Sequence, residues 1–317
     1  MTSLLRAVLG FLLALVLAAV PLSPASAEDL GNPSYPDDPD PLRGLVLPPL
    51  DSLIGLLPPL PVPGAEYAGD LCRSGGDECI DEVIERMEAR LDRLVSTCSH
   101  SAVFSLAYLR VTENVRDAVR SGYFDDAKWL NRVDTVFADL YFDTTSDWEA
   151  GRRANIPAAW RIALQAEDDR AVSGLGNFML AMNAHINRDF PYVLAKVGLT
   201  DPDGTSHKPD HNAYNQRLDS LYAPVFAEEA ARFDPTFDDV NFGTLEETAA
   251  GVIMRGWREM VWRHAELLAL AKGPVQRSLA QKQVETYAAL QALGIRQLFQ
   301  VQSSERRDAW CALHGAG

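Results

Sequence analysis

The spacing of apolar side chains predicts one helix after another from residue 79 onward. In the segment 79–98, apolar residues recur three and four positions apart, which places them on one helix face. Similar segments follow at 99–122, 125–148, 156–169, 171–189, 210–233, 244–273 and 274–293. No segment shows the sustained period-two alternation of a half-buried strand. The sequence therefore predicts an all-α fold with a single multi-helix domain over residues 67–317.

The first 27 residues have a different pattern. Arg6 precedes an apolar stretch over 7–20, and the stretch is followed by Ala25-Ser26-Ala27. A basic start, a short apolar core and small residues at the end are typical of a secretory signal peptide. We therefore expect cleavage after Ala27, a secreted protein, and no stable membrane anchor after cleavage. An uncleaved anchor is the alternative.

Residues 28–66 form a proline-rich extended segment. Residues 28–64 hold ten of the nineteen prolines, first in an acidic stretch and then among many leucines. Proline fixes φ and removes a hydrogen-bond donor, so helix is disfavoured here. We expect the leucine-rich part to lie extended across the domain and to bury its leucines. The alternative is that it binds another protein.

The charge of the chain limits its partners. The net charge of −15 disfavours nucleic acid, whose phosphates it would repel. No basic amphipathic segment indicates binding to an anionic lipid surface. A small molecule or another protein remains as the expected partner, and neither is identified by composition.

Four cysteines allow three pairings. If Cys79 and Cys98 lie at opposite ends of one helix, they are roughly 28 Å apart. A disulfide needs Cα atoms within about 7 Å. This geometry excludes the pair Cys79–Cys98. Cys72 is close to Cys79 across the turn 73–78, so the sequence predicts the pairs Cys72–Cys79 and Cys98–Cys311. A metal site using the Cys98-x-His100 and Cys311-x-x-His314 spacings is the alternative.

The strongest candidate site lies at the end of the uncharged stretch 171–187. A helix that is apolar all round is expected in the interior. His185 and Asp189 are i, i+4 neighbours there, and Asn183 and Asn187 form a second such pair on the far side. Pro191 disfavours helix at the residue before it, so we expect the helix to break and to free backbone carbonyls.

Three interpretations of this site are open. The first is a buried polar network that fixes how the helices cross. The second is a divalent-metal site with His185 and Asp189 as ligands, which is similar to part of the zinc cluster of secreted all-α phospholipase C enzymes. Those enzymes use many histidines, whereas this chain has six. The third is an acid–base site in which Asp189 orients His185, with Asn187 nearby.

Other helices offer partners for this site. Arg258 is a candidate to hold Asp189 or a ligand carboxylate bidentately, and Asn215 is expected to point inward. His264 falls in an apolar stripe and is expected in the core. Asp201, Asp203 and Asp210 loosely resemble a calcium loop without its final glutamate, so we interpret them as a turn with a solvated His207.

Several of these segments resemble one protein family. "CSHSAVFSLAYLRVTE", "VFADLYF", "IPAAW", "DHNAYN", "REMVWRHAELL" and above all "NAHIN-x-D" are similar to a family of uncharacterised bacterial proteins, a domain of unknown function. The resemblance covers residues 79–270 and implies an all-α fold. It implies no activity.

Two classes of function are consistent with these patterns. One is a secreted hydrolase with a buried His185/Asp189 site, with or without a metal. The other is a secreted helical binding or interaction protein whose polar core is structural. A cavity lined by His185, Asp189, Asn215 and Arg258 would favour the first, and a closed, fully paired cluster would favour the second.

Overall fold

The computed structural model describes residues 57–237 and 244–315, except for the side chains of 244–250. Every regular element in these residues is helical, and only two isolated β-bridges occur, so the predicted all-α fold class is confirmed. The elements are α3 (Glu78–Val95), α4 (Ala102–Arg120), α5 (Ala127–Glu149), η1 (Arg153–Asn155), α6 (Ala158–Asp168), α7 (Gly174–Asn183), η2 (Ala184–Asp189), α8 (Phe190–Val197), α9 (Lys208–Asp219), α10 (Tyr222–Arg232), η3 (Pro235–Phe237), α11 (Thr244–Leu270), α12 (Gly273–Leu298) and α13 (Glu305–His314).

The chain divides into two units, Met1–Pro58 and Pro59–Gly317. The second unit contains all the helices that the structure describes. The expected signal peptide, 1–27, and most of the proline-rich segment, 28–66, lie outside the described residues.

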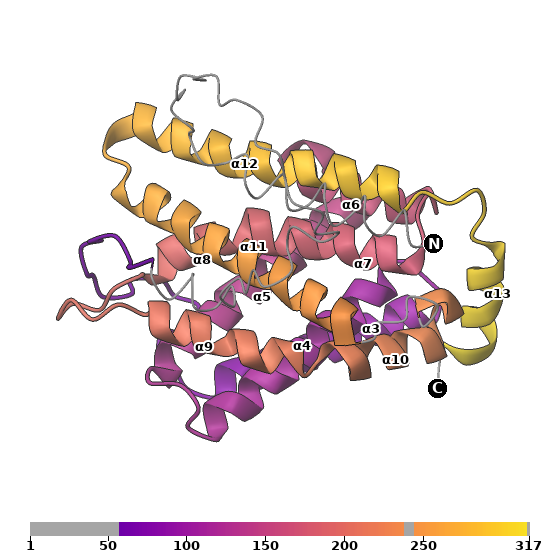
Figure 1. The fold of residues 1–317 in the computed structure, drawn as a ribbon, viewed down its shortest axis with the longest axis horizontal. Helices are drawn as coiled ribbons and strands as arrows, with labels where there is room; N and C mark the ends of the chain where they lie inside the picture. Colours follow the sequence, from indigo (N-terminus) through magenta and orange to yellow (C-terminus); the bar gives the residue numbers. More distant parts are fainter. Residues whose placement is uncertain (1–56, 238–243, 316–317) are drawn as a thin grey trace, which may run out of the picture. The chain divides into compact units, whose positions relative to one another are not determined.

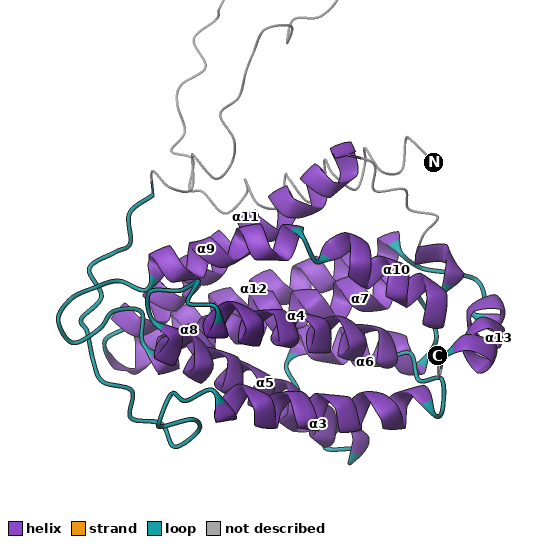
Figure 2. Ribbon diagram, turned by 90° about the horizontal axis from the view of Figure 1, so that it is seen from below, coloured by secondary structure: helices purple, strands orange, loops and turns teal. Residues whose placement is uncertain are grey.

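The uncharged segment forms the centre of the second unit. α7, η2 and α8 follow one another without interruption and pack against α4, α5, α6, α11 and α12. Figure 1 shows α11 and α12 running beside one another in opposite directions, and Figure 2 shows α3 next to α5 on another side of the bundle. The apolar segment is therefore enclosed, as its composition predicts.

The described end of the proline-rich segment departs from expectation. The backbone N–H of Leu60 donates to Glu266 Oε1 on α11 at 2.7 Å, so the chain does lie against the helices here. The Leu60 side chain, however, is 44% exposed, and only Val62 packs partly against the core. The described leucines of this part, Leu57 and Leu60, are thus not buried as expected, although the Leu60 backbone contacts α11.

Both predicted disulfides are present. Cys72 pairs with Cys79 and Cys98 pairs with Cys311, with Cα–Cα distances of 5.6 and 5.9 Å. No cysteine is left free, so the cysteine–histidine metal site is excluded. Two disulfide bonds indicate an oxidising compartment. None of the described helices combines the length and the apolar character that crossing a bilayer requires.

Candidate functional site

The polar end of the central segment is a π-helix. Residues 184–189 adopt π-helical geometry between α7 and α8. The expected break at Phe190 does not occur: Pro191 falls in the first turn of α8, and η2 continues directly into α8. Short π-helices inside α-helices are frequently found at functional sites. The polar residues thus gather on a continuous but widened helix.

His185 and Asp189 contact one another, as their spacing predicts. His185 Nδ1 lies 3.3 Å from Asp189 Oδ2, and both residues are at most 2% exposed. The same carboxylate accepts hydrogen bonds from Trp160 Nε1 at 2.7 Å and from an Arg188 guanidinium N–H at 2.9 Å. Because Trp160 and Arg188 can only donate, Asp189 serves as an acceptor throughout.

This arrangement defines the state of His185. An acceptor at Oδ2 favours the tautomer with the proton on Nδ1, which leaves Nε2 as an acceptor. Burial lowers the pKa of His185, and the hydrogen bond and charge of Asp189 oppose that shift. The ring stacks on Phe137 with a centroid distance of 3.5 Å and meets Tyr108 edge-on at 4.5 Å. His185 is therefore held by one hydrogen bond to Asp189 and by the rings of Phe137 and Tyr108.

A mostly apolar cavity of about 130 Å³ lies beside His185. Its walls come from α4, α5, α7, η2, α8, α9, α10 and α11. The polar residues in its lining are Tyr108, Asp134, His185, Asp210, His211, Tyr214, Tyr222 and Arg258. Neither Asp189 nor Asn215 reaches the cavity, so only part of the residue set named from the sequence lines it.

Four lining residues carry buried polar atoms without a hydrogen-bond partner among the described residues. These atoms are Tyr108 Oη, Asp134 Oδ2, His185 Nε2 and Tyr222 Oη. Burial raises the pKa of Asp134 to about 7 and that of Tyr222 above its ordinary value. An unsatisfied buried polar group costs about 1–3 kcal/mol. The four groups are therefore available to bond a molecule in the cavity.

Arg258 is a buried cation in the cavity wall. Its Nε donates to Asn215 Oδ1 at 2.7 Å, and its Nη2 donates to the carbonyl oxygen of His211. Among the described residues it makes no ion pair, and the predicted contact with Asp189 is not formed. Burial lowers the pKa of Arg258 to about 10, opposed by Tyr214 and Tyr222, so the group stays charged at neutral pH.

The remaining predicted residues are placed as follows. Asn187 donates to Asn183 Oδ1 at 3.0 Å, and Asn183 donates to the carbonyl of Ala288 on α12 at 2.9 Å. Asn187 thus belongs to the packing of η2 on α12 and not to the cavity. Asn215 and His264 are buried, as expected. In the described chain, His185 and Asp189 belong to no group of three His, Cys, Asp or Glu side chains suited to a metal.

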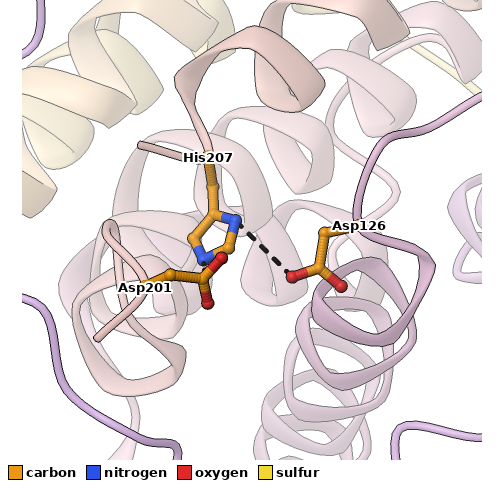
Figure 3. Close-up of side chains that lie close together, drawn as sticks. All are labelled: Asp126, Asp201 and His207. Carbon is orange, nitrogen blue, oxygen red and sulfur yellow. Dashed lines mark ion pairs between the residues drawn. The ribbon is translucent and has the colours of Figure 1, made fainter. Parts of the chain in front are cut away.

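A second polar cluster was not predicted from the sequence. His207 is 6% exposed and not solvated, and its two ring nitrogens face different carboxylates (Figure 3). Nε2 lies 3.4 Å from Asp201 Oδ1, and Nδ1 lies 3.8 Å from Asp126 Oδ2. The indole of Trp129 stacks on the imidazole at 4.6 Å and 12°, which explains the burial. Burial lowers the pKa of His207, although Asp201 and Asp126 oppose the shift.

Some missed residues left a signal in the sequence. Leu130, Asp134, Phe137 and Tyr141 recur at helical spacing, which places Asp134 on a buried face of α5. Tyr108 has no comparable signal, because its helix is apolar on most sides. The Asp126–Asp201–His207 cluster could not be found from spacing, since its members come from segments about 75 residues apart.

Residues 80–298 match the family of unknown function DUF5995. The chain belongs to this family. The matched range contains the whole cavity lining and the Asp126–Asp201–His207 cluster, so both lie within the DUF5995 region. No curated protein and no solved structure matches the chain. The NAHIN-x-D motif and a bacterial origin stay expectations.

Proposed function

We propose that this protein binds a small apolar molecule with an acidic group in the cavity beside His185. The observation that carries the proposal is Arg258, a buried cation without an ion-pair partner in the described chain, in the wall of a mostly apolar cavity. A buried charge is strongly unfavourable unless an opposite charge compensates it. A ligand carboxylate beside the guanidinium would supply that charge.

The size of the cavity limits the ligand. A cavity of about 150 Å³ lined by apolar side chains accommodates benzene. The cavity here is about 130 Å³, so it suits a single ring or a short aliphatic chain. Tyr108, Asp134 and His185 offer polar atoms to a hydroxyl or similar group elsewhere on the ligand.

Two matched pairs of probes test this proposal: benzoate against benzyl alcohol, and hexanoate against 1-hexanol. Isothermal titration or ligand-observed NMR should show that each acid binds about tenfold or more tightly than its alcohol, because a charge-assisted hydrogen bond contributes about 1.5–3 kcal/mol. Arg258→Met should abolish that preference, and Arg258→Lys should retain part of it. Arg277→Met, at an exposed position of α12, is the control and should behave as wild type.

A second variant tests the location. Ala107 is 4% exposed and lines the cavity from α4, so Ala107→Phe should fill the space and weaken every probe. Equal affinity for acids and alcohols would contradict the role of Arg258. Unchanged binding to the folded Ala107→Phe variant would contradict the cavity as the site.

A second candidate function is hydrolysis with His185 as general base. The observation that favours it is the Asp189–His185 pair, in which Asp189 fixes the ring and Nε2 has no partner in the described chain. Such a pair is suited to take a proton from an attacking water. Hydrolysis of p-nitrophenyl esters of short acids should then depend on His185, and His185→Gln should abolish it. Equal rates for both proteins would dismiss this candidate.

We also infer that the protein is exported. The disulfides and the N-terminal pattern support this inference. N-terminal sequencing of protein recovered outside the cytoplasm should begin at Glu28, and a sequence that begins at Met1 would contradict it.

A further inference from the structure

We propose that Asp126, Asp201 and His207 bind a single zinc ion beside the α5 N-terminus. One ligand atom from each residue lies within 4.8 Å of the others. Zinc–nitrogen and zinc–oxygen bonds of about 2.1 Å in a tetrahedral site separate two ligand atoms by about 3.4 Å. His207 Nε2 and Asp201 Oδ1 are separated by 3.4 Å, which is long for a hydrogen bond but fits two ligands of one ion.

The two carboxylates face different nitrogens of His207, so one of them has to move for all three side chains to bind one ion. His207 Nδ1 lies 3.8 Å from Asp126 Oδ2, beyond hydrogen-bond distance. The Asp201 side chain is 41% exposed, and within the described chain it pairs with His207 alone. It is therefore the ligand with room to adjust. An imidazole binds one ion through one nitrogen, so both carboxylates must meet at the same nitrogen of His207. The 4.8 Å limit on the separations of the three ligand atoms allows this after a shift of Asp201.

The backbone holds the histidine and its turn in place. The His207 N–H donates to the carbonyl of Leu199 at 3.0 Å. The Asp201 N–H donates to the carbonyl of Thr205 at 2.8 Å, and the Gly204 N–H returns a bond to the carbonyl of Asp201 at 2.9 Å. Gly204 has a φ of +95°, which only glycine adopts easily, so this tight turn is specified by the sequence.

Hydrogen bonds also hold Asp126, the third proposed ligand, and stacking holds the plane of the His207 ring. Asp126 Oδ1 caps α5 by accepting from the Trp129 N–H at 2.9 Å, which leaves Oδ2 toward His207. Asp210 accepts from the N–H groups of Asp125 and Asp126 and so positions this end of α5. Trp129 is itself held by a 2.8 Å hydrogen bond from Nε1 to the Gly198 carbonyl, and it orients the histidine ring by stacking.

The ligand types indicate zinc in preference to magnesium or calcium. Imidazole suits zinc, whereas all-oxygen sites suit magnesium and calcium. Asp126 and Asp201 are partly exposed, so solvent can reach a fourth position on the ion. The buried histidine and two carboxylates thus form a three-ligand site with an open side, which would join the α8–α9 loop to α5.

The test is isothermal titration of ZnCl₂ into tag-free, chelator-treated protein, with thermal unfolding measured in parallel. Wild type should bind one equivalent with micromolar or tighter affinity, and zinc should raise its Tm, because a ligand that binds only the folded state stabilises it. His207→Gln and Asp201→Asn should each weaken binding by about tenfold or more and reduce the Tm shift. His314→Gln, an exposed histidine on α13, should match wild type.

Asp201→Asn keeps the proposal testable if His207→Gln does not fold, since Asp201 lies on an exposed turn. Binding of the acidic probes in the cavity should persist in Asp201→Asn, so failure here is separate from failure of the proposed function. Absence of saturable zinc binding in wild type would overturn the site. An unchanged zinc affinity in the folded Asp201→Asn variant would also overturn the site. Binding of calcium as tightly as zinc would overturn it as well.

Discussion

The two disulfides offer a matched comparison of how a cross-link stabilises this domain. The Cys72–Cys79 disulfide closes a short loop, with a sequence separation of 7. The Cys98–Cys311 disulfide closes a long loop, with a sequence separation of 213. Each pair joins a residue with left-handed backbone, Cys72 (φ 50°) or Cys98 (φ 47°), to a buried helical cysteine that is 7% exposed. Replacing both cysteines of a pair by serine therefore has similar local effects in the two cases.

The difference that remains is loop closure in the unfolded chain. With the entropy of closing a loop taken as proportional to the logarithm of its length, the long loop is worth about 5 kcal/mol and the short loop about 2 kcal/mol. We therefore expect Cys98→Ser/Cys311→Ser to lose about 3 kcal/mol more than Cys72→Ser/Cys79→Ser. For a domain of this size, that corresponds to a Tm lower by about 6–12 °C.

Urea unfolding followed by circular dichroism at 222 nm measures both variants against wild type. The same comparison in reductant is the control, because all three proteins should then converge. Equal losses, or a larger loss for the short loop, would refute the loop-length argument and point to local packing of Cys79 or Cys311 as the main contribution.

Two further predictions concern the cavity. His185→Gln should lower the free energy of unfolding by about 1–3 kcal/mol, measured by urea unfolding, because the Asp189 carboxylate loses its imidazole donor; an unchanged stability would show that this pairing contributes nothing. Burial raises the pKa of Asp134 from 3.8 to about 7. Between about pH 4 and pH 7, Asp134 is therefore protonated in the folded state and ionised in the unfolded state. Wild-type stability should thus fall relative to Asp134→Asn as pH rises from about 4 to about 7, by up to about 4 kcal/mol, and level off above pH 7. Parallel pH profiles for the two proteins would contradict a protonated Asp134.

Most of the helices could be predicted because they depend on local periodicity, whereas α8 (Phe190–Val197) and α13 (Glu305–His314) were not predicted. The disulfide pairing followed from one helix length, which separates Cys79 from Cys98, and from the closeness of Cys72 to Cys79 in the sequence. The i, i+4 contacts of His185 with Asp189 and of Asn183 with Asn187 followed for the same reason. A π-helix could not be inferred, because the usual effect of Pro191 on the preceding residue indicates a break rather than a widened turn.

The cavity and the second cluster depend on how distant segments pack. Arg258 was a candidate to hold Asp189 or a ligand carboxylate, and in the structure it donates to Asn215 and to the His211 carbonyl on α9 instead of to Asp189. His207 was expected in solvent because its neighbours in the sequence are polar and loop-forming. It is buried because Trp129, on a helix far earlier in the chain, covers its ring.

Trp129 contacts both the cavity beside His185 and the Asp126–Asp201–His207 cluster, so the two sites share a wall. The indole stacks on His207 and also lines the cavity beside Leu130 and Val133. Asp210 likewise lines the cavity and supports the Asp126 backbone through its carboxylate. A group that fixes Asp126 and His207 would therefore also fix part of the cavity wall. Asp126 caps the N-terminus of α5, and Asp134 and Phe137 lie further along the same helix, so α5 connects the Asp126–Asp201–His207 cluster to the residues around His185.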